Sequence, residues 1–255
     1  MKKALLIVSF GVASQDARKN TLDLYMKEAR EAATDFDLFT AYSSKRIIGK
    51  ILKREGQLID TPLEALEKIA TSGYEEIVVQ SFGLICGDTF IELENQLKDY
   101  EDTFKKITLI QPLLHAGCAW EEIATLLTEK ITLQPSEAVV WVGHGTYTAA
   151  QADYVQLSAA LKKITPGVFL GTIKNNLTVD HIIGQLKENQ ITRVILKPFL
   201  LTSGHHVSQD ISQMWAKGLE KAGFHVVVDD APLATDEKVR HYFIEQIKEC
   251  QHENR

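Results

Sequence analysis

The hydrophobic positions of this 255-residue chain fall in short runs of consecutive apolar residues, separated by longer segments with helical spacing. Consecutive apolar positions are typical of strands that are buried on both faces of a parallel sheet. Such runs occupy residues 4–10, 77–81, 107–110, 138–142, 168–171, 194–201 and 225–228. Alternation of these strands with helical segments predicts right-handed βαβ units and an α/β sandwich.

One predicted helix has a complete set of boundary signals. Thr61 is a good N-cap, Pro62 suits the first helical position, and Glu64 stands where it can close a capping box. Gly73 is a natural residue for the position after the last turn. The sequence therefore predicts a helix over residues 62–72.

Two segments of the first half of the chain each have a similar segment in the second half. ALLIVSFG (4–11) has a counterpart in AVVWVGHG (138–145), and IVVQSFGLICG (77–87) has one in VILKPFLLTSG (194–204). We therefore predict an α/β fold of two similar α/β/α sandwich halves, 1–134 and 135–255, each with a mainly parallel sheet. Loops at the carboxyl ends of parallel strands commonly line a binding crevice, so we expect the halves to face a central cleft.

Composition excludes several classes of function. Hydrophobic residues make up 45% of the chain, and the net charge is −6 with no block of Lys or Arg, which argues against nucleic-acid or anionic-membrane partners. No window approaches the roughly 18–20 apolar residues that span a bilayer, and MKKALLIVSFGV fits a buried first strand better than a signal peptide. The three cysteines, Cys86, Cys118 and Cys250, fit reduced thiols in the cytoplasm.

Two histidines follow strands of the second half. His144 stands between Gly143 and Gly145 after the strand at 138–142, and His206 follows the strand at 194–201. Neighbouring parallel strands end at one edge of a sheet, so the two imidazoles can converge and bind a divalent metal such as cobalt, nickel, iron or zinc. The alternative, that each is a hydrogen-bonding loop residue, is about as well supported. His205 is a weaker candidate for a further ligand, because adjacent side chains tend to diverge.

Other chemistries have less support. The sequence contains no G-x-x-x-x-G-K-[ST] phosphate loop, no G-x-G-x-x-G dinucleotide turn and no G-x-S-x-G nucleophile elbow, so we expect no nucleotide cofactor. Ser9-Phe10-Gly11 forms a small turn after the first strand and is a candidate for ligand contact.

Several segments together resemble one enzyme family. GHGT, PFLLTSGHHVSQD, KKALLIVSFG and the pair AYSSKRIIGKIL and TPLEALEKIATSGYEEIVVQSF are similar, in the same order, to segments of the anaerobic-pathway sirohydrochlorin cobalt chelatases. These are class II chelatases, related to the ferrochelatases. The resemblance implies a tetrapyrrole in the cleft and a divalent metal, Co²⁺ first and Ni²⁺ or Fe²⁺ as alternatives, bound by His144, His206 and a glutamate. We expect substrate contacts from residues at the strand ends: Ser9, Phe10, Gly11, Phe82, Gly83, Thr146 and Lys174.

Three positions depart from the family pattern. The glutamate in a Gly-Thr-Val-Glu-like segment is replaced by Lys174. The histidine of a GHGT-x-His pattern is replaced by Thr148, and a Gln-Pro-Leu-His stretch reads Gln-Ser-Phe-Gly at residues 80–83. A protonated lysine cannot bind a metal ion or accept a pyrrole proton, and its charge opposes M²⁺ nearby.

The expected function is cobalt insertion into sirohydrochlorin during cobalamin synthesis, by a cytoplasmic metal chelatase. Lys174 keeps two alternatives open. One is a carrier that binds a tetrapyrrole or haem without metallating it. The other is an enzyme that removes metal or acts on another macrocycle. Whether the chain forms a homo-oligomer also remains open.

Overall fold

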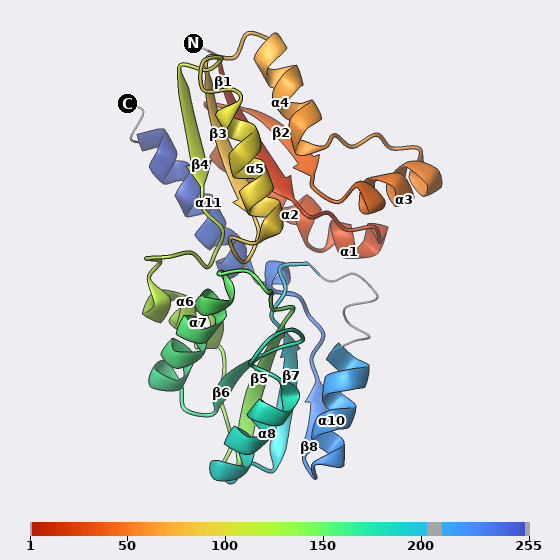
Figure 1. The fold of residues 1–255 in the computed structure, drawn as a ribbon, viewed down its shortest axis with the longest axis vertical. Helices are drawn as coiled ribbons and strands as arrows, with labels where there is room; N and C mark the ends of the chain where they lie inside the picture. The colour runs from red at the N-terminus through yellow and green to blue at the C-terminus, as the bar shows by residue number, and fades with distance from the viewer. Residues whose placement is uncertain (1, 203–210, 253–255) are drawn as a thin grey trace. The chain divides into compact units, whose positions relative to one another are not determined.

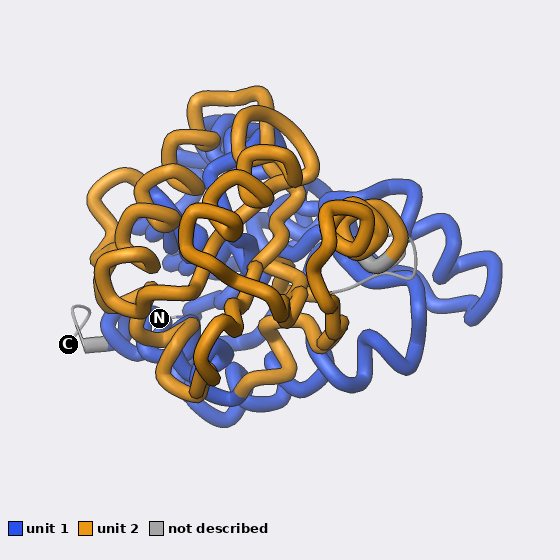
Figure 2. The backbone as a smooth tube through the Cα atoms, turned by 90° about the horizontal axis from the view of Figure 1, so that it is seen from below, with its two compact units in different colours: residues 1–115, 237–255 blue, residues 116–236 orange. Residues whose placement is uncertain are grey.

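The computed structural model describes residues 2–202 and 211–252. The chain divides into two compact units, Met1–His115 with Glu237–Arg255, and Ala116–Asp236 (Figure 2). Each unit contains a four-stranded sheet in which every strand pair is parallel.

Unit 1 is a sandwich with helices on both faces of its sheet (Figure 1). The strand order is β2-β1-β3-β4. On one face of the sheet, Leu6 of β1 packs with Leu66 of α4 and Leu93 of α5. Helices α11 and α2 pack together, and α11 contacts β3 and β4. The elements are β1 (Lys3–Ser9), α1 (Gln15–Lys19), α2 (Leu22–Ala32), β2 (Asp37–Tyr42), α3 (Lys45–Glu55), α4 (Pro62–Thr71), β3 (Glu76–Phe82), α5 (Asp88–Lys98), β4 (Lys106–Ile110) and α11 (Glu237–His252).

Unit 2 repeats this plan with the strand order β6-β5-β7-β8. On one face, Val140, Phe169 and Trp215 belong to a buried cluster with residues of α8 and α10. The elements are α6 (Trp120–Thr128), β5 (Glu137–Gly143), α7 (Gln151–Ile164), β6 (Val168–Thr172), α8 (Val179–Glu188), β7 (Arg193–Pro198), a π-helical turn (Ile211–Trp215), α10 (Ala216–Lys221), β8 (His225–Val228) and a 3₁₀ turn (Leu233–Thr235).

The two sheets confirm the predicted repeat. Their orders coincide when β1, β2, β3 and β4 are matched with β5, β6, β7 and β8. The two similar sequence pairs then fall on equivalent strands, since residues 4–11 overlap β1 and 138–145 overlap β5, while 77–87 and 194–204 begin in β3 and β7. The α/β class with two similar halves is therefore confirmed.

The predicted helix start at Thr61 is also confirmed. The Thr61 side chain accepts a hydrogen bond from the Glu64 backbone at 3.4 Å, and the Glu64 carboxylate accepts one from the Thr61 backbone at 2.7 Å. The helix ends at Thr71 with Ser72 as its C-cap, and Gly73 has φ +76°.

Two strand predictions differ from the structure. No strand was predicted at β2, because its residues DLFTAY mix polar and apolar positions at the edge of the sheet. The strand predicted over 194–201 ends at Pro198. Proline has no N–H to donate to a ladder, and the apolar residues Phe199 and Leu201 are buried as loop rather than strand.

The compact units also differ from a division at residues 134 and 135. Helix α6 precedes that point but packs against α7 in unit 2. Helix α11 follows it but belongs to unit 1, where Arg240 makes an ion pair with Glu28 at 2.8 Å. The Gln80 side chain ties α11 further, because its Nε2 donates to the Phe243 carbonyl at 2.8 Å.

No helix within 2–202 and 211–252 is both long enough and apolar enough to cross a bilayer.

Candidate functional site

Two predicted residues of unit 2, His144 and Lys174, lie together at the carboxyl edge of its sheet. His144 directly follows β5 and Lys174 follows β6, and these strands are neighbours with Gly143 opposite Thr172. Their pairing continues past the strand ends, because the Lys174 N–H donates to the His144 carbonyl at 3.0 Å. The backbone of Lys174 is therefore fixed directly beside that of His144.

The His144 ring is exposed, and one of its nitrogens contacts a backbone carbonyl. Its Nδ1 lies 3.1 Å from the Gly145 carbonyl oxygen. A carbonyl oxygen only accepts hydrogen bonds, so in the neutral ring this contact places the proton on Nδ1 and the lone pair on Nε2. Metal-binding histidines typically donate one ring N–H to a backbone carbonyl in this way, which orients the other nitrogen toward the ion. This arrangement leaves Nε2 as the acceptor nitrogen, which the predicted metal-binding role of His144 would require.

Lys174 places a positive charge in the same cluster. Its Nζ lies 5.8 Å from the centre of the Tyr147 ring, a cation–π distance. Tyr147 is 79% exposed, whereas Lys174 is half-buried. Lys174, which by resemblance replaces the family's glutamate ligand, therefore interacts with Tyr147 of the loop that follows His144.

A polar network holds the loops that carry these residues. The Asn175 side chain donates to the Thr146 carbonyl at 2.9 Å, and the Thr146 N–H donates to the Gln151 side chain at 3.1 Å. Gln151 in turn donates to Asn176 at 3.1 Å. This network could not be predicted from the sequence, because its partners are separated by about one βα unit and only the fold brings them together. It fixes the loop after β5 to the loop after β6.

Burial keeps a neutral tyrosine beneath this edge. Tyr154 of α7 is 2% exposed, and burial raises its pKa to about 12, with a backbone hydrogen bond at Gly145 acting in the opposite direction. Its ring lies against Gly143, where an added Cβ would come within 2.6 Å of the ring. The phenol therefore supports the His144 turn as a neutral group.

Gly145→Ala is expected to destabilise this turn. Gly145 has φ +69°, and an added Cβ would lie 2.5 Å from the Lys174 carbonyl oxygen, a backbone atom that cannot move cheaply. We expect a loss of about 1–3 kcal/mol in the free energy of unfolding, measured by urea denaturation. Gly49→Ala is the control, because Gly49 lies in α3 with no atom within 4 Å of an added Cβ. Equal stability of the two variants would contradict this view of the turn.

His206 and His205 lie outside the residues that the structure describes. The chain that leads to them leaves the sheet beside β5, since Pro198 pairs with Val142 and the Phe199 N–H donates to the Val142 carbonyl at 2.8 Å. Within 2–202 and 211–252, no three His, Cys, Asp or Glu side chains come together in a cluster that could hold a metal ion. The pairing of His144 with His206 therefore stays a prediction.

The predicted residues of unit 1 occupy the equivalent edge of their own sheet. Ser9 at the end of β1 pairs with Phe82 at the end of β3. Phe10 is 59% exposed, and Gly11 has φ +90° with the Tyr42 ring so close that an added Cβ would lie 2.5 Å from it. Phe82 instead stacks on Tyr25 at 4.0 Å and is 3% exposed, so its ring fills the core. Gly83 follows, half-buried.

Two arginines that the sequence did not single out hold the turn after β1. Arg18 is buried and donates to the Val12 carbonyl at 3.2 Å, and it also pairs with Glu55 of α3. Arg54 of α3 donates to the Ala13 carbonyl at 2.6 Å. The hydrogen bond from Arg18 holds the pKa of Glu55 below its usual value. In the sequence, the basic composition of residues 45–54 is the only indication of these contacts.

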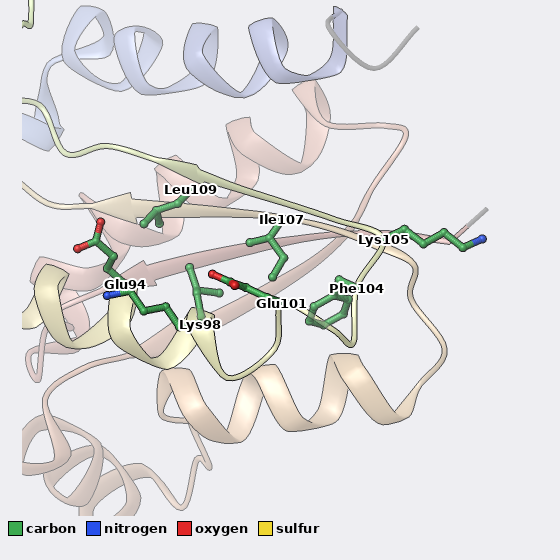
Figure 3. Close-up of a pocket in the computed structure, with 8 residues that line it drawn as sticks. Glu94, Lys98, Glu101, Phe104, Lys105, Ile107 and Leu109 are labelled. Carbon is green, nitrogen blue, oxygen red and sulfur yellow. The ribbon is translucent and has the colours of Figure 1, made fainter.

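A hollow of about 430 Å³ elsewhere in unit 1 does not match the predicted site (Figure 3). It lies between α5 and β4, toward the strand's amino end and therefore away from the edge that carries Ser9. It is lined by two acidic side chains, Glu94 and Glu101, and two basic ones, Lys98 and Lys105. Neither the position nor the charge favours a role in the expected chemistry.

Comparisons with known proteins agree over nearly the whole chain. Residues 3–252 match the family described as "Cobalt chelatase (CbiK)". The chain is 30% identical over 255 residues to "Sirohydrochlorin cobaltochelatase" of Salmonella typhimurium, covering 98% of this chain and 97% of that protein. It is also 30% identical over 236 residues to "Sirohydrochlorin cobaltochelatase CbiKC" of Nitratidesulfovibrio vulgaris, covering 89% and 82%.

Solved structures support the fold. "SirB from Bacillus subtilis with Fe3+" superposes with a TM-score of 0.68, covering 98% of this chain and 95% of that one, at 14% identity. At that identity the likeness concerns architecture alone, and it agrees with two similar α/β halves.

Proposed function

This chain belongs to the cobalt chelatase (CbiK) family, and on that premise we propose that it inserts Co²⁺ into sirohydrochlorin. The two relatives at 30% identity both carry the name sirohydrochlorin cobaltochelatase. The metal is a substrate here, since it leaves the protein inside the macrocycle. The single structural observation that best supports the proposal is the contact of His144 Nδ1 with the Gly145 carbonyl oxygen.

His144 would receive the ion before it reaches the macrocycle. Its Nδ1–H is engaged by the Gly145 carbonyl, so the lone pair of Nε2 is available from an exposed ring. Imidazole nitrogen suits Co²⁺, Ni²⁺ and Fe²⁺ alike, so the ligand type alone leaves these metals as alternatives. His206 is the proposed second ligand and His205 a further candidate, both by resemblance.

Insertion replaces the inner N–H protons of the macrocycle with the metal ion, so both protons must be taken up by bases as the metal enters. A histidine that has released the metal regains its lone pair and can accept one of them. In this chain no carboxylate stands at position 174 to share that task. We therefore propose that the histidines carry both the metal transfer and the proton uptake.

Lys174 would then serve the macrocycle rather than the metal. Its ammonium lies on the Tyr147 ring at the same edge as His144. Sirohydrochlorin carries acetate and propionate groups around its rim, and a lysine offers a positive charge with three N–H donors to such carboxylates.

The proposed location of the reaction is the cytoplasm.

The direct test is an absorbance assay with purified protein. Sirohydrochlorin is mixed with the protein and with Co²⁺, Ni²⁺ or Fe²⁺ in separate reactions, and the spectrum of the metallated product is followed over time. We expect Co²⁺ insertion faster than the reaction without protein. A spectral shift on binding with no metallation would overturn the proposal in favour of a carrier. Loss of iron from added haem would overturn it in favour of metal removal.

A further inference from the structure

Helix α3 carries a concentration of positive charge. Five basic residues lie within its eleven positions, in a chain whose net charge is −6. Arg46, Lys50 and Lys53 are exposed and stand at i, i+4 and i+7, so they form one continuous row, named here the basic ridge. None of the three has an ion pair with any residue that the structure describes.

The inner face of α3 explains why the helix stays in place. Ile51 is fully buried, and Ile47 and Ile48 are half-buried beside it. Ser44 caps the first turn, and Gly56 ends the helix with φ +66°. The ridge is therefore presented by a well-anchored helix, although like charges at i, i+3 and i+4 repel one another.

The ridge is continuous with the turn after β1. Arg54 lies one helical turn beyond Lys50, and its guanidinium donates to the Ala13 carbonyl at 2.6 Å. Glu55 pairs with Arg18, which donates to Val12 at 3.2 Å. Helix α3 starts directly after β2 and lies beside α1 (Figure 1). Its start is therefore at the same edge of the sheet as Ser9, Phe10 and Gly11.

We propose that the basic ridge Arg46–Lys50–Lys53 binds the carboxylates at the rim of the tetrapyrrole substrate. This inference rests on the proposed function and deepens it by assigning substrate recognition to unit 1. A macrocycle with acetate and propionate groups offers several negative charges at its periphery, and a row of unpaired cations is its electrostatic complement. Long lysine and arginine side chains on an exposed helix can follow a substrate that carries acids on more than one pyrrole.

An anionic membrane is the competing partner for such a helix. Leu52 and Leu58 are exposed near the ridge, 44% and 82%, and basic and apolar groups together can bind lipid. The ridge, however, is linked through Arg54 to Ala13, two residues after Gly11, and its outer face carries charges rather than an apolar stripe. These observations favour the small acidic ligand.

The test compares two triple variants with the same change in charge. Arg46→Gln/Lys50→Gln/Lys53→Gln removes the ridge. Lys187→Gln/Lys217→Gln/Lys221→Gln removes three exposed lysines from α8 and α10 of unit 2. Lys187 and Lys221 lie in the last turns of these helices, just before β7 and β8 and thus away from the carboxyl edge. The dissociation constant of sirohydrochlorin is measured by absorbance titration without metal, at low and high salt, and kcat for Co²⁺ insertion is measured at saturating substrate.

We expect the ridge variant to raise the dissociation constant about tenfold at low salt, with little change at high salt and an unchanged kcat. The control should match wild type, and methyl-esterified substrate should bind wild type and the ridge variant equally. Far-ultraviolet circular dichroism and thermal unfolding check that both variants fold as wild type. Equal dissociation constants for the ridge variant and wild type would overturn the proposal.

Two further outcomes separate the causes of failure. If wild type sediments with phosphatidylglycerol vesicles and the ridge variant does not, while both bind sirohydrochlorin equally, the ridge serves a membrane and the proposal is overturned. If wild type binds sirohydrochlorin through the ridge but inserts no metal, the proposed function fails and the ridge assignment stands.

Discussion

His144→Ala is expected to lower kcat/KM for Co²⁺ insertion by about 10²- to 10⁴-fold, the range for removal of a group that handles protons in the transition state. The loss should be that large because the same imidazole is proposed to receive the metal and then to accept a pyrrole proton. Its ring is exposed and contacts Gly145 through Nδ1, so the substitution should leave the fold intact. The rate is measured from the absorbance of the metallated product, with Co²⁺ affinity measured separately by calorimetry.

His181→Ala is the matched control. His181 is exposed on α8 and contacts Gln185 of the same helix at 2.6 Å, so it has no expected part in the reaction. A rate for His144→Ala close to that of wild type would remove His144 from the proposed site. His206→Ala extends the test to the second predicted ligand, for which the same loss is expected.

Lys174→Glu is expected to tighten Co²⁺ binding roughly ten- to hundredfold. The substitution replaces a unit positive charge by a negative one beside a divalent ion. At distances of about 6 Å and a dielectric constant near that of water, this change is worth about 1–3 kcal/mol. The backbone hydrogen bond from Lys174 to His144 is unaffected by the side chain, so the new carboxylate stays in the same loop. Calorimetric titration with Co²⁺ gives the affinity.

Lys174→Gln separates the two halves of that charge change. It removes the cation without adding a ligand, so its effect on Co²⁺ affinity should be smaller than that of Lys174→Glu. If Lys174 serves the macrocycle, both variants should also raise KM for sirohydrochlorin. An unchanged Co²⁺ affinity in Lys174→Glu would show that this side chain does not face the metal.

Much of the fold was predictable because buried parallel strands leave a strong signal. Residues 138–142 are apolar without interruption, and β5 is buried along its whole length in the centre of its sheet. The edge strand β2 lacks that signal, since only its last two residues are buried. The fate of α11 was not predictable either, because its apolar face would suit either sheet and only contacts such as Gln80 with Phe243 decide between them.

The candidate site was predictable in part. Strand ends followed by glycine and histidine pointed to His144, and the structure places Lys174 beside it through a backbone hydrogen bond. The predicted contact residue Phe82 is a different case, because its position at a strand end did not reveal that Tyr25 and Phe243 enclose its ring. Hydrogen bonds across distant loops, such as Asn175 with Thr146, leave no periodic pattern in a sequence.

The return of α11 to unit 1 has a consequence for the order in which the chain can fold during synthesis. Residues 116–236 are an insertion within a sheet domain whose last helix is translated after them. All segments of unit 2 are therefore synthesised before unit 1 is complete. The faces of Tyr25 and Phe82 that contact Phe243 stay uncovered until that residue leaves the ribosome. A chain stopped at Asp236 would keep every strand of both sheets and yet leave the earlier-made unit with an open hydrophobic face.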